Sequence, residues 1–95
     1  MPGKIAVKFY ALLRQRLGMS AIEVDADGLT ILELLRRVEK QAGRSFLDDL
    51  LDPEHLLLAG TIILVNGENV RLKQGLGTPL RGGDTVDLFS PAGGG

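Results

Sequence analysis

Apolar and polar residues alternate strictly in two stretches, one near the beginning and one near the end of the chain. They are residues 4–10, in which Ile5, Val7 and Phe9 share one face, and residues 85–89. Successive side chains of a strand point to opposite faces of a sheet. This period of two therefore predicts two strands, each with one buried face.

The residues that follow the first of these strands predict a hairpin. Residues 22–24 again have strand character, and residues 11–17 form a short connection that ends at Gly18. The two strands are expected to pair with each other, although this connection is longer than a tight turn.

Residues 31–42 carry the clearest periodic pattern, and it is helical. Their apolar residues recur every three or four positions and form one stripe: Ile31, Leu34, Leu35, Val38 and Ala42. Thr30 and Glu33 have the spacing of a capping box, in which each side chain binds a free N–H group of the other residue. Gly43 follows as a stop signal. We predict a helix over residues 31–42 that buries this stripe.

The segment between the helix and the last strand predicts another hairpin. Residues 61–65 are apolar without a break, which predicts a strand covered on both faces. The Asn66-Gly67 pair that follows is the strongest short signal for a hairpin turn, and the returning strand is expected within residues 68–72. Residues 46–51 are expected to form a short helical turn.

The predicted order is strand, strand, helix, strand, short strand, strand. An amphipathic helix that follows a hairpin buries its apolar stripe by lying across one face of a sheet. We therefore predict an α+β fold of the ubiquitin-like β-grasp type, with a mixed sheet of about five strands and one main helix packed on one face. Residues 1–91 would form this domain, and residues 92–95 would form a flexible glycine tail.

Composition and charge narrow the possible functions. Ninety-five residues suffice for one modest core but leave too few to wall a deep cleft around a large cofactor. The net charge is -1, so the basic excess typical of nucleic-acid binding is absent. No apolar stretch approaches the ~20 residues of a membrane span and no signal-peptide pattern opens the chain, so a cytoplasmic location is expected. These features favour a carrier or a binding module over an enzyme.

Few residues could support metal or nucleophile chemistry. The chain has no cysteine, and therefore no disulfide, thiolate nucleophile or cysteine metal site. His55 is the one histidine, and no second histidine is present to share a metal with it. We interpret His55 as a surface residue, and we expect neither a metal site nor a bound cofactor.

The C-terminus is the strongest candidate for chemistry. The chain ends in Gly93, Gly94 and Gly95, a run that average glycine usage rarely produces by chance. Glycine has no Cβ, so an extended glycine backbone can pass through a channel that side chains would block. Such a tail can deliver the α-carboxylate of Gly95 into the active site of another protein. A terminus without a function is the alternative, because chain ends are often disordered.

An aromatic residue just before the tail predicts a contact surface. Phe89 lies on the face of its strand opposite to the buried residues, where an aromatic ring can anchor a partner. Ile63 and Val65 are expected to extend this patch on the sheet face that the helix leaves uncovered. The alternative is that a loop, residues 46–58, folds over these side chains.

Four stretches of the chain together resemble the sulfur-carrier β-grasp proteins, and in particular the small subunit of molybdopterin synthase. They are residues 7–14 (VKFYALLR), 64–67 (LVNG), 80–86 (LRGGDTV) and 89–95 (FSPAGGG). The last stretch has an aromatic residue, a proline and a terminal Gly-Gly in the order of that family. The resemblance implies a carrier that is not catalytic alone.

The resemblance also implies a chemical role for the tail. The carboxylate of Gly95 would be adenylated with ATP by a separate enzyme of the ubiquitin-activating type, and a persulfide donor would convert it to a thiocarboxylate. Gly93 and Gly94 would give it a slim approach, and Phe89 and Arg14 would contact the partners. The sulfur acceptor would be a pterin precursor held by the large subunit of molybdopterin synthase.

Other functions stay open at this point. The same activated Gly95 could be joined to lysines of target proteins, as in ubiquitin-like modifiers. Gly93 and Ser90 depart from the usual ending of the family, which leaves other sulfur pathways, such as that of thiamine, open. A third possibility is a β-grasp interaction domain whose tail has no role. Arg16, near Arg14, is interpreted as a solvated residue.

Overall fold

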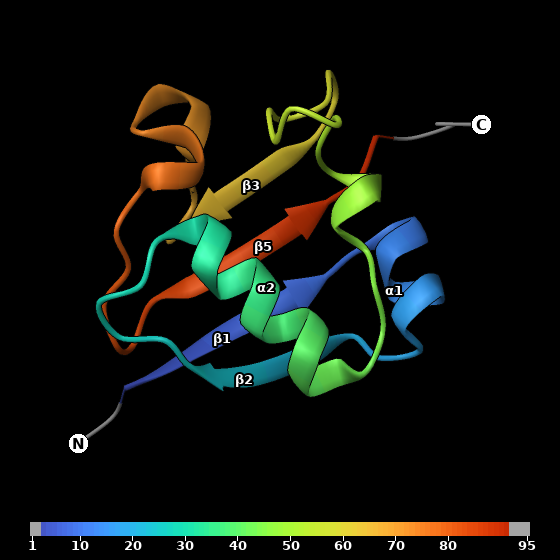
Figure 1. Ribbon diagram of the computed structural model, residues 1–95. Coiled ribbons are helices and arrows are strands. Elements are labelled where there is room, and N and C mark those ends of the chain that lie inside the picture. The colour runs from blue at the N-terminus through green and yellow to red at the C-terminus, as the bar shows by residue number, and fades with distance from the viewer. Residues whose placement is uncertain (1–2, 92–95) are drawn as a thin grey trace.

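Five strands and two α-helices make up the fold in the computed structural model, which describes residues 3–91 (Figure 1). In chain order they are β1 (Lys4–Phe9), α1 (Ala11–Leu17), β2 (Ala21–Asp25), α2 (Ile31–Ala42), β3 (Ile62–Val65), β4 (Glu68–Asn69) and β5 (Thr85–Phe89). Three short 3₁₀ helices are added, η1 (Leu47–Asp49), η2 (Val70–Leu72) and η3 (Gly75–Gly77).

The strands form one mixed sheet in the order β2-β1-β5-β3-β4. The first and last strands of the chain, β1 and β5, lie side by side and parallel in its centre, and the other pairs are antiparallel. Helix α2 crosses one face of this sheet (Figure 1). The predicted α+β fold of the ubiquitin-like β-grasp type is therefore confirmed.

Helix α2 begins and ends where the sequence predicts. The Thr30 N–H donates to Glu33 Oε1 at 2.9 Å, and Thr30 Oγ1 accepts from the Glu33 N–H at 3.3 Å, which completes the capping box. Gly43 adopts a left-handed φ of 73° and its N–H binds the Glu39 carbonyl. Four stripe residues are fully buried against the sheet: Ile31, Leu34, Leu35 and Val38.

The connection predicted for residues 11–17 is instead a second helix, α1. Leu13 and Leu17, one turn apart, are buried and fasten it to the core. Gly18 ends the helix with a φ of 68°, and its N–H donates to the carbonyl of Arg14 at 2.9 Å. A helix of seven residues shows only one such apolar pair, so its periodicity is too short to recognise from the sequence.

Strand β3 corrects another expectation, because residues 3–91 cover only one of its faces. Ile63 and Val65 are buried in the core on the helix side of the sheet, whereas the side chain of Ile62 is 41% exposed. The segment of residues 46–58 does not cover that second face. Its buried residues join the core on the helix side, where the ring of Phe46 packs edge-to-face on Phe9 at 6.2 Å.

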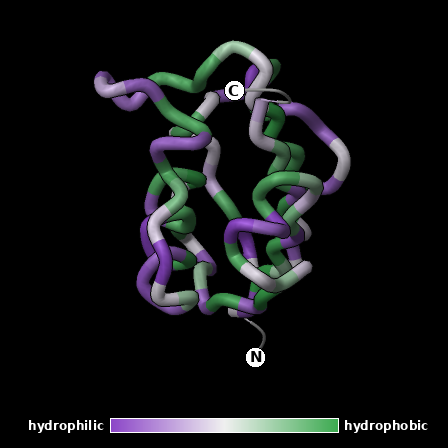
Figure 2. The backbone as a smooth tube through the Cα atoms, turned by 90° about the vertical axis from the view of Figure 1, so that its right-hand side faces the viewer, coloured by the Kyte–Doolittle hydropathy of each residue, from purple (hydrophilic) through white to green (hydrophobic). Residues whose placement is uncertain are grey.

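The hairpin return and the helical turn are both present. The returning strand β4 has two residues and passes directly into η2, and η1 forms within the predicted helical turn. The described chain begins and ends at opposite ends of the domain (Figures 1 and 2). Within residues 3–91 no helix is long and apolar enough to cross a membrane.

Candidate functional site

The face of the sheet opposite to α2, here called the outer face, carries a mostly apolar centre on β3 and β5. Its members follow from the strand register, because directly paired residues share a face. Ile62 pairs with Phe89, and Leu64 pairs with Asp87. Lys8 of β1 flanks Asp87 on the other side. All of these side chains are exposed or half-exposed.

Phe89 lies on the outer face, as predicted, and it is part of an aromatic pair. The ring of Tyr10 stacks on it with centroids 4.4 Å apart and an interplanar angle of 9°. The Tyr10 hydroxyl donates to Asp87 Oδ1 at 2.8 Å, and the Tyr10 N–H donates to the Leu88 carbonyl at 3.3 Å. Tyr10 is therefore held by both its backbone and its side chain, and it covers one side of the Phe89 ring.

The contact with Asp87 changes the acidity of Tyr10. The hydrogen bond that the hydroxyl donates to this carboxylate raises the pKa of Tyr10 above its ordinary value, and partial burial and the negative charge of Asp87 add to the effect. The Tyr10 hydroxyl therefore keeps its proton to a higher pH than the hydroxyl of a free tyrosine does. Sequence reasoning missed Tyr10, although its position after Phe9 at the end of an alternating strand points it to the same face as Lys8.

Ile63 and Val65 do not belong to this face, and their prediction as contact residues on it was wrong. They pair with Leu88 and Val86, which are buried, so all four side chains point toward α2. Their neighbours Ile62 and Leu64 take the outer positions. A one-residue shift along a strand exchanges its faces, and the unbroken apolar run of this strand gives no sign of which parity is buried.

The chain leaves the sheet beside this outer face. Ser90 and Pro91, the two residues after β5, are half-buried. They form one wall of a groove of about 970 Å³, whose other walls come from α1 and from five further residues: Arg44, Asp48, Asp49, Leu58 and Ala59. We call Ser90 and Pro91 the tail root. The predicted glycines, residues 93–95, lie outside the described residues.

Two arginines of α1 have different surroundings. Arg16 lines the groove at the tail root and forms an ion pair with Asp49, so it is not merely solvated as expected. Arg14 is exposed and is not among the residues that line the groove. The structure therefore leaves the predicted contact role of Arg14 as a prediction.

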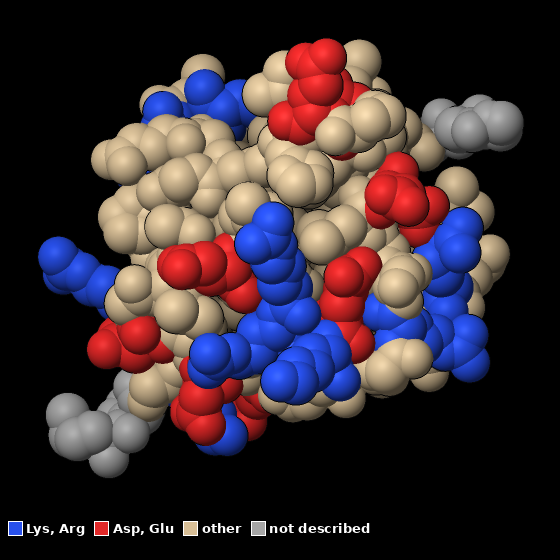
Figure 3. All heavy atoms as spheres, viewed as in Figure 1, with Lys and Arg blue, Asp and Glu red and all other residues tan. Residues whose placement is uncertain are grey.

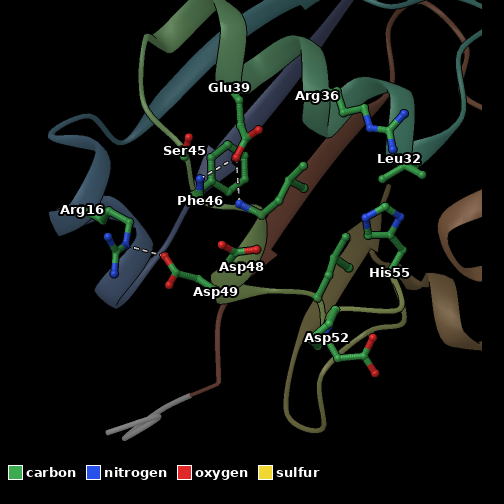
Figure 4. A pocket seen from close by; sticks show the side chains of 13 residues that line it. Arg16, Leu32, Arg36, Glu39, Ser45, Phe46, Asp48, Asp49, Asp52 and His55 are labelled. Atoms are coloured by element: carbon green, nitrogen blue, oxygen red, sulfur yellow. Dashed lines mark hydrogen bonds and ion pairs between the residues drawn. The ribbon is translucent and has the colours of Figure 1, made fainter.

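A second hollow, of about 620 Å³, lies between α2 and residues 45–55 (Figure 4). The carboxylate of Glu39 in this hollow is already hydrogen-bonded. It accepts the N–H groups of Phe46 at 2.6 Å and Leu47 at 2.9 Å. His55 at the rim of the hollow is exposed. No group of three metal-ligating side chains occurs in the described part of the chain. The carboxylate of Glu39 therefore holds the loop that begins at Phe46 against α2.

Comparison with known proteins extends these observations. The sequence pattern of the ThiS family matches residues 7–95. A candidate sulfur carrier protein of Archaeoglobus fulgidus is 35% identical over 74 residues, which cover 78% of this chain and 83% of that protein.

Solved structures resemble this chain over nearly its whole length. SAMP1 from Haloferax volcanii has a TM-score of 0.79 at 25% identity, over 97% of this chain and 99% of that one. A chain of the BexX/CysO complex of Amycolatopsis orientalis has a TM-score of 0.74 at 30% identity, over 96% and 99%. A candidate molybdopterin converting factor subunit 1 from Pyrococcus furiosus has a TM-score of 0.63 at 25% identity, over 94% and 98%.

Proposed function

This chain belongs to the ThiS family of ubiquitin-like β-grasp sulfur carriers, and we propose that it carries sulfur as a thiocarboxylate on Gly95 for molybdopterin biosynthesis. It would be inactive as a catalyst alone and would serve as the small subunit of molybdopterin synthase. The observation that carries the proposal is that an aromatic contact face lies immediately before the C-terminal residues.

The outer face has the properties of a docking surface. Aromatic residues dominate the binding energy of many interfaces because they bury a large area at a small entropic cost. The ring of Phe89 is already fixed by its stack on Tyr10, and Ile62 beside it is 41% exposed. Only the tail root separates Phe89 from residues 92–95. A partner that binds this face would therefore receive the chain end next to it.

The first chemical step would take place on an adenylating enzyme of the ubiquitin-activating type. An oxygen of the Gly95 carboxylate would attack the α-phosphorus of ATP, the bond between the α- and β-phosphates would break, and pyrophosphate would leave. The resulting acyl-adenylate has AMP as a good leaving group. The carrier would contribute the docking face and the carboxylate, and the partner would contribute the catalytic groups.

The second step would require a persulfide donor. Its terminal sulfur would attack the carbonyl carbon of the acyl-adenylate, and AMP would leave with one former carboxylate oxygen. A thiol of the donor system would then attack the donor's sulfur in the acyl disulfide, which would release the thiocarboxylate and form a new disulfide. This chain has no cysteine, so no internal thiol competes for the activated Gly95.

The acceptor that we propose is a pterin precursor held by the large subunit of molybdopterin synthase. The likeness to the converting factor subunit of Pyrococcus furiosus supports this choice of pathway. A second candidate function is that of a protein modifier joined through Gly95 to lysines, and the likeness to SAMP1, a small archaeal modifier protein, favours it. Both functions share the adenylation step.

Mass spectrometry of the protein from its own cells tests the proposal. We expect a fraction whose intact mass corresponds to one oxygen replaced by sulfur. Methionine oxidation gives nearly the same mass change, so the sample is also treated with iodoacetamide, which alkylates a thiocarboxylate but leaves a sulfoxide unchanged. Because the chain has no cysteine, single alkylation assigns the sulfur to the C-terminus. A variant with one residue added after Gly95 is the control and should stay unalkylated.

The same experiment separates the alternatives. Recovery of the chain linked through Gly95 to many proteins, without alkylation, would support the modifier. Where alkylation shows the thiocarboxylate, a portion of the sample that has not been alkylated is incubated with the large subunit and the pterin precursor. Sulfur transfer to the precursor would support the molybdopterin pathway, and its failure would assign the carrier to another sulfur pathway, such as that of thiamine.

A further inference from the structure

The tail root rests on the backbone of a glycine far away in the sequence. Pro91 lies so close to Gly60 that a Cβ added to Gly60 would be 3.3 Å from the Cβ of Pro91 and 3.5 Å from its Cα. The contact at 3.3 Å would be tighter than nine in ten real Cβ contacts. Gly60 also has a φ of 90°, a left-handed conformation that side chains disfavour. A side chain at this position would therefore strain the backbone, and it would also push Pro91 away by a few tenths of an ångström.

The loop that carries Gly60 is held from several sides. The Leu58 N–H donates to the Leu50 carbonyl at 2.9 Å, and the buried hydroxyl of Thr61 donates to the same carbonyl at 2.9 Å. The Thr61 N–H donates back to Leu58 at 3.0 Å, and Arg71 Nη2 donates to the Leu58 carbonyl at 2.6 Å. Gly60 thus presents a fixed surface to the proline.

Proline suits this place. Its ring fixes φ near −65° and it has no N–H group to satisfy, so it adds rigidity at the last half-buried position before the C-terminal residues. One residue, Ser90, separates this contact from Phe89 of the outer face. Docking and the direction of the tail are therefore held by neighbouring but distinct contacts.

We propose that Gly60 is a positioning residue, which seats Pro91 and thereby sets the direction in which the C-terminal glycines enter the adenylating enzyme. This inference rests on the proposed function of Gly95. Four residues follow Pro91 and can span at most about 14 Å. With so short a reach, the position of the Gly95 carboxylate depends on the direction of the chain at the tail root, and a misplacement of about 1 Å can cost a reaction roughly a hundredfold in rate.

Gly60→Ala is the decisive variant, and Gly67→Ala is its matched control. Gly67 has nearly the same backbone angle, φ 86°, but nothing lies within 4 Å of a Cβ added there. Both variants therefore strain the backbone alike, and only Gly60→Ala disturbs Pro91. The assay is ATP–pyrophosphate exchange by the adenylating enzyme from the same cells, with circular dichroism to verify folding.

We expect Gly60→Ala to lower kcat of the exchange by roughly ten- to a hundredfold with KM nearly unchanged, since the outer face is intact. Gly67→Ala should keep the wild-type values. Pro91→Gly, which frees the tail root without strain at Gly60, should also lower kcat. Adding Gly60→Ala to Pro91→Gly should cause no further loss, because the two changes remove one contact.

The outcomes distinguish this inference from the proposed function. If the wild-type protein supports no exchange at all, the proposed function is wrong. If the wild-type protein supports exchange but Pro91→Gly retains the wild-type kcat, then the contact between Gly60 and Pro91 has no role in positioning the tail. This conclusion holds even where Gly60→Ala fails to fold. A full additional loss from Gly60→Ala in the Pro91→Gly background would equally overturn the inference.

Discussion

The two faces of the sheet use the same strands for opposite purposes. On the helix side, Ile63 and Leu88 are completely buried in the core, and the outward surface of that layer carries interspersed acidic and basic side chains (Figure 3). Ile62 and Phe89 are the neighbours of these two residues along β3 and β5. They pair with each other on the outer face and stay partly exposed. Burial on one face gives the domain its stability, and exposure on the other leaves apolar area for a partner.

The largest difference expected between the two faces is in the free energy of unfolding. It can be measured by substituting two adjacent residues of β3, one on each face. Ile63→Ala removes a fully buried side chain and should lower the free energy of unfolding by about 2–5 kcal/mol. Ile62→Ala removes the same atoms from a position 41% exposed and should cost about 1 kcal/mol or less. Urea denaturation followed by circular dichroism gives both values. Equal losses at the two positions would contradict the assignment of the faces.

A smaller effect, on binding, should appear on the outer face alone. Phe89→Ala should weaken binding to the adenylating enzyme by about 2 kcal/mol, because it removes an aromatic anchor. The matched control is Leu72→Ala, which truncates an apolar side chain on η2 that is 87% exposed. Isothermal titration calorimetry gives the two affinities. A loss for Leu72→Ala equal to that for Phe89→Ala would place the docking surface elsewhere.

Features whose signals are local could be predicted from the sequence. Helix α2 is an example, because its stripe, its capping residues Thr30 and Glu33 and its stop at Gly43 all lie within one segment. The outward position of Phe89 was also predictable, because the residues of β5 alternate strictly. Short-range periodicity contains all the information that these features need.

Features that depend on pairing between distant segments could not be predicted. The register of β3 with β5 decides which of its alternate residues face outward. The unbroken apolar run does not show this, so Ile63 and Val65 were predicted for the outer face, whereas Ile62 and Leu64 lie on it. The contact of Gly60 with Pro91 likewise needs the loop before β3 and the end of β5 to meet in space. No spacing within either segment records such a contact.

The smallest effect concerns the hydrogen bond that joins Tyr10 to Asp87, and it appears only at high pH. The pKa of Tyr10 is raised in the folded state, so the stability that this bond contributes is present below the unfolded tyrosine pKa of about 10 and is lost as pH rises through the folded value. Tyr10 is the only tyrosine and the chain has no tryptophan, so tyrosinate absorbance reports this one group.

Asp87→Asn is the test of this dependence. It removes the carboxylate that accepts the hydroxyl and repels the tyrosinate, so the titration midpoint of Tyr10 should fall toward the value of free tyrosine. Asp25→Asn, on the outer face of the edge strand β2, is the control for a general loss of negative charge and should leave the midpoint where it is in the wild type. A midpoint that stays raised in Asp87→Asn would mean that burial against Phe89, rather than the carboxylate, sets the acidity of Tyr10. The aromatic pair would then keep its geometry without the negative charge of Asp87.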